Sequence, residues 1–381
     1  MVNAPADITA GGAEKHVHEL ARELRSRGHE LAFLHAFPSR DGQYEPDTTV
    51  LHSTDWRDDQ VRRVRNHVDD WLSLPAERLQ KVVAAHRPDV VHTHNLPGIT
   101  TGIWEVCRRL GLPVVHTLHD YQLLCPRKSL MRSDGEPCRP GPLLCGFRTK
   151  RMTRWAPAVS HVVGVSRFIL DAHEGIFDHA EHELIRHPVV PTALRRLRQP
   201  GDRLRRLGYI GSVHVIKGVR VLIAAAPELA KLGVTVTIAG KGRFWKEAAA
   251  AAERLPGLEY VDFVSGPEKE DFFEKCDAGI VPSIWNEPGG PSYTALEWLC
   301  AGRPVLVSGR GGLGEALDRV SGSIVIEPTR DGIVEAVERL LDPHVWAESV
   351  ANVAPVSGEG EYERWTKAYQ GVYERALAGV S

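Results

Sequence analysis

Short apolar segments rich in β-branched residues recur along most of the chain, separated by helical patterns or turn residues. In the first half they lie at residues 31–34, 90–91, 114–115 and 162–165. In the second half they lie at residues 206–210, 234–239, 258–261, 278–281, 304–308 and 323–326, and most are followed by glycine. Buried parallel strands have this composition and are usually joined by helical crossovers. The alternation therefore predicts an α/β fold with parallel sheets.

The apolar segments form two series, separated at residues 195–206 by a basic, polar stretch without an apolar face. A chain of 381 residues has the length of two domains. Its 43% hydrophobic and 25% charged residues are typical of globular proteins. We therefore expect a first domain at residues 1–195, a second at residues 205–357, and a C-terminal helix within residues 358–381.

The front of the first domain has a distinct pattern. Apolar residues at helical spacing predict a helix over residues 13–24, and Gly28 stands where its C-cap belongs. Only residues 1–4 remain for a strand before the loop that leads to this helix. Either the first strand is short, or the true start of the chain lies upstream.

Charge and targeting signals exclude several classes of protein. With 47 basic and 49 acidic residues, the net charge of −2 gives no global field for nucleic acid, which we do not expect as a partner. Residues 1–12 lack the basic and apolar regions of a signal peptide, and no apolar run has the length of a membrane helix. Six dispersed cysteines fit a reducing compartment. These features predict a cytoplasmic protein.

Glycines follow several predicted strands. Gly11 and Gly12 precede the first helix, Gly211 and Gly218 flank a strand-to-helix turn, and Gly240 with Gly242 follows another strand. Such loops bring backbone N–H groups and helix N-termini close to a diphosphate. One glycine after a strand is more often only a turn, so each of these loops is a weak signal by itself.

Residues 309–314 match the pattern G-x-G-x-x-G directly after a predicted strand, which would indicate a dinucleotide-binding dehydrogenase. That fingerprint also needs an acidic residue about 20 positions further on. Glu327 ends a predicted strand too early, and too little chain follows for a substrate domain. Hydride transfer is therefore the poorer hypothesis.

In the stretch at residues 282–297, two carboxylates, Glu287 and Glu297, bracket a loop of glycines and prolines, and residues 296–301 are then predicted to form a helix that ends at Gly302. Further motifs stand in a fixed order along the chain: GGAEKHVHELARELRSRGHE at 11–30, HTLHDYQLLCPR at 116–127, GVSRF at 164–168, GYIGSVHVIKGVRVLIAA at 208–225, IAGKG at 238–242, FFEKCDAGIVPSIWNEPGG at 272–290, LEWLCAGRPVLVS at 296–308 and GGLGE at 311–315. In these motifs the chain resembles the family-4 retaining glycosyltransferases of the GT-B fold, over nearly its whole length.

This resemblance implies two Rossmann-like domains facing across a cleft. It also implies transfer of a sugar from a nucleotide diphosphate donor to an acceptor hydroxyl, with retention of anomeric configuration. The acceptor would be a small molecule or a glycan that enters from the first domain.

The resemblance also assigns roles to individual residues. Glu297 would hydrogen-bond the ribose hydroxyls, and Lys217 would neutralise the leaving diphosphate. His119 would face the donor sugar. The other residues expected at the donor are Gly11, Gly12, Gly211, Ser212, Lys241, Gly290, Ser292, Tyr293 and Thr294.

Two departures from the family pattern leave alternatives open. Gly289, rather than Glu287, stands where the usual spacing places the first of the two glutamates. Either an insertion in the loop still delivers Glu287 to the catalytic position, or that carboxylate is absent. Ser212 follows Gly211 where the family commonly has arginine. Lys217 would then contact the diphosphate with help from Lys241, Arg243 or His214.

Other functions and ligands stay open at this stage. A sugar-nucleotide epimerase of the same fold, or a noncatalytic sugar-nucleotide binder, would share the donor site. We expect no cofactor and no metal requirement. Cys125, Cys138 and Cys145, with His116 or His119, form a weaker zinc hypothesis because they lack paired C-x-x-C spacing. The basic residues at 148–155 leave open a lipid-linked acceptor or a membrane surface, although a solvated helix face has the same composition.

Overall fold

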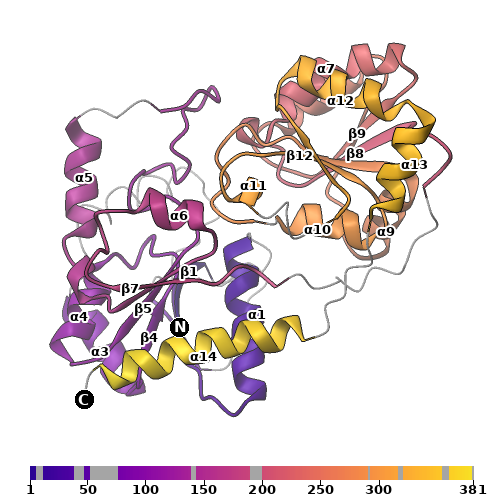
Figure 1. Ribbon diagram of the computed structural model, residues 1–381. Helices are drawn as coiled ribbons and strands as arrows, with labels where there is room; N and C mark the ends of the chain where they lie inside the picture. The colour runs from indigo at the N-terminus through magenta and orange to yellow at the C-terminus, as the bar shows by residue number, and fades with distance from the viewer. Residues whose placement is uncertain are drawn as a thin grey trace. The chain divides into compact units, whose positions relative to one another are not determined.

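The computed structural model describes residues 1–5, 12–37, 47–51, 76–138, 143–188, 200–290, 292–315, 321–353 and 360–379 (Figure 1). Its contacts divide the chain into two compact units. Unit 1 consists of Met1–Leu130, Cys138–His187 and Tyr362–Ser381, and unit 2 of Met131–Pro137 and Pro188–Glu361.

Unit 1 is built on a parallel sheet of seven strands in the order β3-β2-β1-β4-β5-β6-β7. The strands are β1 (Val2–Pro5), β2 (Phe33–Phe37), β3 (Thr48–Val50), β4 (Val91–Thr93), β5 (Val114–Leu118), β6 (His161–Gly164) and β7 (Glu181–Leu184). The first strand is short, with four residues. Every residue of β4, β5 and β6 is buried, which matches the apolar runs of the sequence.

The helices of unit 1 connect these strands. They are α1 (Gly12–Ser26), α3 (Ala76–His86), α4 (Gly102–Arg109), α5 (Leu143–Thr153) and α6 (Arg167–Ala172), with a 3₁₀ turn at Ala156–Ala158. The predicted helix at residues 13–24 corresponds to α1. Gly28 follows α1 with a φ of 87°, a backbone conformation that favours glycine at the end of a helix.

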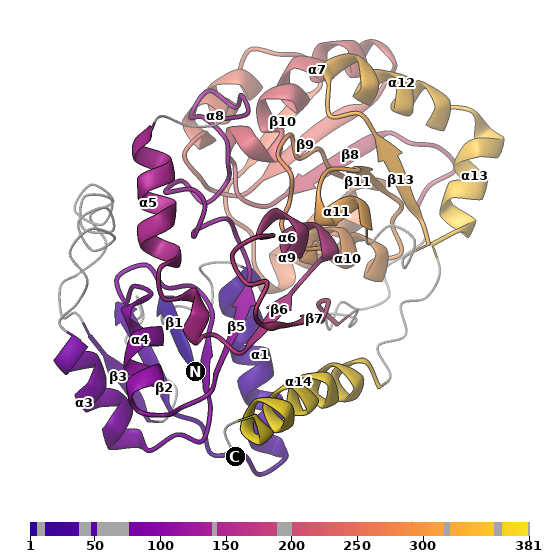
Figure 2. The same ribbon diagram turned by 60° about the vertical axis from the view of Figure 1, so that its left-hand side comes forward.

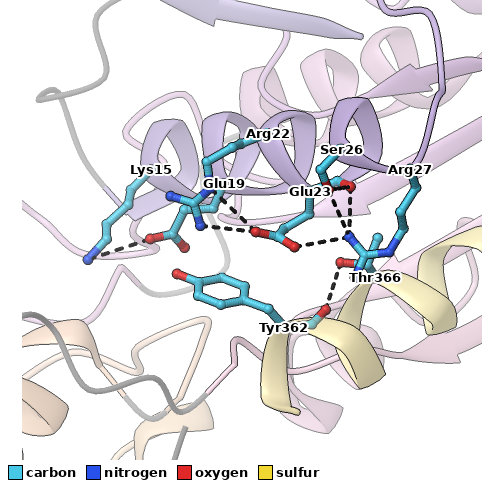
Figure 3. Close-up of polar contacts among 8 residues, drawn as sticks. All are labelled: Lys15, Glu19, Arg22, Glu23, Ser26, Arg27, Tyr362 and Thr366. Atoms are coloured by element: carbon cyan, nitrogen blue, oxygen red, sulfur yellow. Dashed lines mark hydrogen bonds and ion pairs between the residues drawn. The ribbon is translucent and has the colours of Figure 1, made fainter. Parts of the chain in front are cut away.

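The last helix, α14 (Glu361–Ala378), lies alongside α1 (Figures 1 and 2). Trp365, Tyr369 and Val372 of α14 share one apolar cluster with Leu20 and Leu24 of α1. At the rim of this contact, the guanidinium of Arg22 lies 5.2 Å from the ring centroid of Tyr362 (Figure 3). The final helix of the chain thus completes the core of unit 1.

Unit 2 has a parallel sheet of six strands in the order β10-β9-β8-β11-β12-β13. The strands are β8 (Arg206–Ile210), β9 (Thr235–Ala239), β10 (Leu258–Val261), β11 (Ala278–Val281), β12 (Val305–Ser308) and β13 (Ser323–Ile326). The helices are α7 (Val219–Lys231), α8 (Trp245–Ala252), α9 (Gly266–Lys275), α10 (Tyr293–Cys300), α11 (Gly312–Glu315), α12 (Arg330–Leu340) and α13 (Pro343–Ala351), with a 3₁₀ turn at Val215–Lys217.

Alternate residues of these strands belong to two separate apolar clusters, one on each face of the sheet. Leu207 and Ile280 belong to the cluster that contains residues of α7, α8 and α12. Ile210 and Val281 belong to the cluster with Phe273 of α9 and residues of α10. Both faces are covered, as the predicted parallel sheets require.

A short segment inside the range predicted for the first domain makes its contacts in unit 2. This segment is Met131–Pro137. The Arg220 guanidinium donates to the carbonyl of Asp134 at 3.3 Å. A side chain at Gly135 would meet Val215 at 2.8 Å, so the loop packs closely on unit 2.

The strand orders locate the position in each sheet where ligands commonly bind. Each order reverses once, between β1 and β4 in unit 1 and between β8 and β11 in unit 2. In open α/β sheets, ligands bind at such reversals, beyond the carboxyl ends of the strands. Within the described ranges, none of the helices is both long enough and apolar enough to cross a membrane.

Candidate active site

In unit 2, an ion pair joins the two loops that flank the strand reversal. Lys217 ends the 3₁₀ turn after β8, and Glu287 lies in the loop after β11. The Lys217 Nζ atom is 2.7 Å from Glu287 Oε1, with 32% of the lysine side chain and 9% of the glutamate side chain exposed. A cation with access to solvent therefore stands where the fold favours an anionic ligand.

The carboxylate of Glu287 is fixed by further contacts. The Ser283 hydroxyl donates to Oε1 of Glu287 at 2.6 Å. Lys217 Nζ also lies 5.3 Å from the ring centroid of Trp285, within cation–π range. The Lys217 ammonium is thus held by the Glu287 carboxylate and by the Trp285 ring. The charge of Glu287 also acts on Tyr209, whose pKa is raised first by burial and then further by this carboxylate.

Two glycines let the loops at this edge of the sheet meet. Gly218 has a φ of 78°, and a Cβ there would lie 1.8 Å from the carbonyl oxygen of Pro282. Gly311 has a φ of 64°, and a Cβ there would lie 2.5 Å from the carbonyl oxygen of Glu287. A larger residue at Gly218 would push apart the loops that carry Lys217 and Glu287, and one at Gly311 would push the Glu287 loop away from the segment after β12.

The contact at Gly311 also explains the glycine pattern at residues 309–314. The N–H of Gly312 donates to the Glu287 carbonyl at 2.7 Å, and the segment follows β12, which is not the first strand of its unit. A dinucleotide fingerprint instead opens a full crossover helix after the first strand of its sheet. These glycines therefore serve to hold the Glu287 loop.

Helix α10 begins in the same region, directly after the Glu287 loop. The Ser292 hydroxyl accepts from the N–H of Ala295 at 3.1 Å and so caps the helix. Tyr293 and Thr294 form its first turn, where backbone N–H groups carry partial positive charge. Further along α10, Glu297 accepts from Lys269 of α9 at 2.7 Å. The two glutamates of the loop region therefore engage two different lysines.

The remaining predicted donor residues of unit 2 lie in neighbouring loops. Gly211 and Ser212 follow β8, and the Tyr209 hydroxyl donates to the Ser212 carbonyl at 2.7 Å. Lys241, after β9, pairs with Asp262 at 3.1 Å. Burial lowers the pKa of His214, and the charges of Arg243 and Lys217 lower it further. Gly290 is buried at the end of the Glu287 loop.

In unit 1, histidines gather at the corresponding strand reversal. His94 follows β4, His119 follows β5, and His16 lies in α1. The Nδ1 atom of His94 is 3.0 Å from Nε2 of His119. The ring centroids of His16 and His119 are 4.8 Å apart. The structure thus brings His119 together with two histidines that we did not predict as site residues.

Other aromatic groups surround this histidine cluster. The Tyr369 hydroxyl of α14 contacts Nε2 of His16 at 3.0 Å, and His187 contacts Nδ1 of His16 at 3.0 Å. Burial lowers the pKa of His16, His94 and His119 well below the ordinary range, and neighbouring imidazoles lower it further. The rings are neutral at pH 7 as a result.

The other predicted residues of unit 1 divide as follows. Gly12 begins α1, whereas Gly11 lies outside the described residues. The predicted cysteine site is not supported: in the part of the chain that the structure describes, the side chains that could share a metal ion are His16, His94 and His119. Arg148, at the start of the basic run, is buried and donates to the carbonyl of Gln122 at 2.9 Å.

Comparison with known proteins agrees with this architecture. Residues 10–192 match the family model described as Glycosyltransferase Family 4, and residues 205–343 match the model Glycosyl transferases group 1. Glycogen synthase of Mycobacterium tuberculosis is 28% identical, with 91% of this chain and 86% of the relative aligned. D-inositol 3-phosphate glycosyltransferase of Acidothermus cellulolyticus is 26% identical, with 97% of this chain and 86% of the relative aligned.

A solved structure with the same fold is Anabaena HepE in complex with UDP and glucose. It superposes with a TM-score of 0.68 at 16% identity, covering 99% of this chain and 98% of that chain. This level of identity supports the fold. The two family models and the sheet topology together identify the activity class: the chain belongs to the family-4 type of glycosyltransferases with the GT-B fold.

Proposed function

We propose that this glycosyltransferase takes its sugar from a nucleoside diphosphate donor and retains the anomeric configuration. The observation that carries the proposal is Lys217 at the strand reversal of unit 2, held at 2.7 Å from Glu287. A lysine at this position suits a diphosphate because parallel α/β sheets bind ligands there.

The chemistry gives Lys217 its role. Transfer breaks the bond between the anomeric carbon and the diphosphate, which leaves with the electron pair, and forms a bond from that carbon to the acceptor oxygen, whose proton passes to the leaving diphosphate. Negative charge grows on the diphosphate as the bond breaks, so an ammonium beside it stabilises the transition state more than the bound donor. Glu287 and Ser283 keep the lysine in place.

The start of α10 would complete the binding of the donor. Its first-turn N–H groups, at Tyr293 and Thr294, supply partial positive charge to the diphosphate. Glu297, on the same helix, would accept hydrogen bonds from the ribose hydroxyls. Lysine and a helix N-terminus together offset the diphosphate charge, so we propose that transfer needs no metal ion.

The similar structures suggest which nucleotide base and which sugar of the donor to test first. HepE was solved with UDP and glucose, so UDP-glucose is the first donor to test. We propose a thermal-shift panel of UDP, GDP, ADP and dTDP sugars, since a bound ligand raises the melting temperature according to its affinity.

The donor selected by that panel then tests the reaction. With an acceptor present, we expect release of the nucleoside diphosphate and a product whose anomeric signal in proton NMR has the configuration of the donor. Incubation with donor alone should leave the sugar unchanged, whereas an epimerase would convert it. Binding without turnover across a broad acceptor panel, or an inverted product, would contradict the proposal.

A further inference from the structure

Three histidines in unit 1 bring ring nitrogens from three separate elements to one place. His16 comes from α1, His94 from the segment after β4, and His119 from the segment after β5. One nitrogen from each ring lies within 4.8 Å of the other two. His16 and His94 are buried, and His119 is partly exposed. The cluster is therefore enclosed but can be reached from solvent through His119.

The separations are close to those of a metal site with three histidine ligands. At a Zn–N distance of about 2.0–2.1 Å, tetrahedral geometry places ligand nitrogens about 3.4 Å apart. Nδ1 of His94 and Nε2 of His119 are already 3.0 Å apart. The ligand nitrogens all lie within 4.8 Å of one another, so binding an ion would draw the rings together by up to about 1.4 Å.

The surroundings of these rings also fit a metal ion. Within the described part of the chain, Nε2 of His94 is buried without a hydrogen-bond partner, so no hydrogen bond at that atom opposes a rotation of the ring toward an ion. His16 contacts Tyr369 through Nε2 and His187 through Nδ1. If one His16 nitrogen bound the ion, its contact with Tyr369 or His187 would be lost. The remaining contact would orient the ring, as hydrogen-bond partners of metal-binding histidines commonly do.

We propose that His16, His94 and His119 bind one divalent transition-metal ion of the zinc type. Imidazole nitrogens suit zinc, cobalt, nickel and copper, whereas magnesium and calcium need oxygen ligands. Three protein ligands leave a fourth position, on the side of the partly exposed His119, for water. The ion is not needed for transfer.

The test uses the full chain, prepared without a polyhistidine tag, stripped with chelator and titrated with Co²⁺. We expect one Co²⁺ per chain, visible absorption bands of a tetrahedral site, and displacement of Co²⁺ by Zn²⁺. Calorimetric titration with Zn²⁺ measures the affinity. Because no sugar nucleotide is present, failure here overturns the metal site and leaves the proposed transfer reaction untouched.

Variants assign the ligands. His16→Gln and His119→Gln should each weaken Zn²⁺ binding by more than a hundredfold, and circular dichroism melts verify that both variants fold. His344→Gln, an exposed histidine of unit 2, is the matched control and should bind as the unmodified chain does. No saturable metal uptake, or unchanged affinity in either ligand variant, would overturn the proposal.

Discussion

Replacing Lys217 by methionine removes the ammonium group and keeps a side chain of similar length. Glu287 would then lose its cationic partner at 2.7 Å but keep the Ser283 hydroxyl at 2.6 Å. Because about a third of the lysine side chain is exposed, solvent screens the ion pair. We expect a loss of about 1–2 kcal/mol in the free energy of unfolding, which lowers the melting temperature of unit 2 by about 2–8 °C.

The expected effect on catalysis is larger than the effect on stability. Removing one group that stabilises transition-state charge typically lowers kcat by about 10²–10³-fold, equivalent to about 3–4 kcal/mol. Steady-state kinetics with the best donor of the panel measures kcat well below the melting temperature, so unfolding does not contribute. Lys217→Arg keeps the positive charge and should retain more activity than Lys217→Met.

A double variant separates the two effects. In Lys217→Met/Glu287→Gln, the carboxylate charge is removed together with the ammonium, so much of the lost stability should return. Activity should not return, because the leaving diphosphate still lacks its cation. Near-normal kcat in Lys217→Met, or recovery of kcat in the double variant, would refute the role of Lys217.

Three further predictions concern other parts of the molecule. Gly311→Ala should lower the free energy of unfolding by about 1–3 kcal/mol and should lower kcat because it moves Glu287. The control is Gly302→Ala, which has a similar φ of 73° but open space around the Cβ, and which should lower stability without lowering kcat. Equal kinetics in the two variants would contradict this prediction. Glu297→Gln should raise the KM for the donor about tenfold with a smaller change in kcat, and an unchanged KM would argue against ribose binding. Burial lowers the pKa of His116 to about 3, so as the pH falls from about 6.5 the unfolded chain takes up a proton there that the folded chain does not. The free energy of unfolding should therefore fall by about 1.4 kcal/mol per pH unit from this residue alone. Denaturation measured at a series of pH values should show that His116→Gln takes up one proton fewer on unfolding than the unmodified chain.

Much of the fold of unit 2 could be predicted because its inner strands, β8, β9, β11 and β12, are almost fully buried, and its edge strands β10 and β13 still carry apolar residues. Strands β8, β10, β11 and β13 begin and end at the predicted residues, while β9 and β12 begin one residue later than predicted. Apolar runs bounded by turn residues carry this information directly.

The sequences of two edge strands of unit 1 contain no apolar run that would predict a strand. Strand β7 (Glu181–Leu184) has two exposed residues, and β3 (Thr48–Val50) is only partly buried. Edge strands do not need apolar residues on both faces, so their sequences resemble loops. Strand β2 (Phe33–Phe37) begins two residues later than predicted, because the apolar run starts before the pairing with β1 does.

The sequence could name candidate site residues but not the contacts between them. Lys217 and Glu287 are distant in sequence, and they meet because β8 and β11 are neighbours in the sheet. The partners Ser283 and Trp285 lay within the predicted loop, yet nothing in their spacing marked them. The contact of His119 with His16 likewise depends on strand order, which apolar patterns do not specify.

The central claim is that Lys217 holds the diphosphate of the donor at the strand reversal of unit 2. Calorimetric titration of the unmodified chain and of Lys217→Met, with the preferred nucleoside diphosphate and with the corresponding nucleoside, tests it most directly. We predict that Lys217→Met weakens binding of the diphosphate at least about tenfold, or 1.4 kcal/mol, and leaves binding of the nucleoside unchanged. Equal affinity of the two proteins for the diphosphate would contradict the claim.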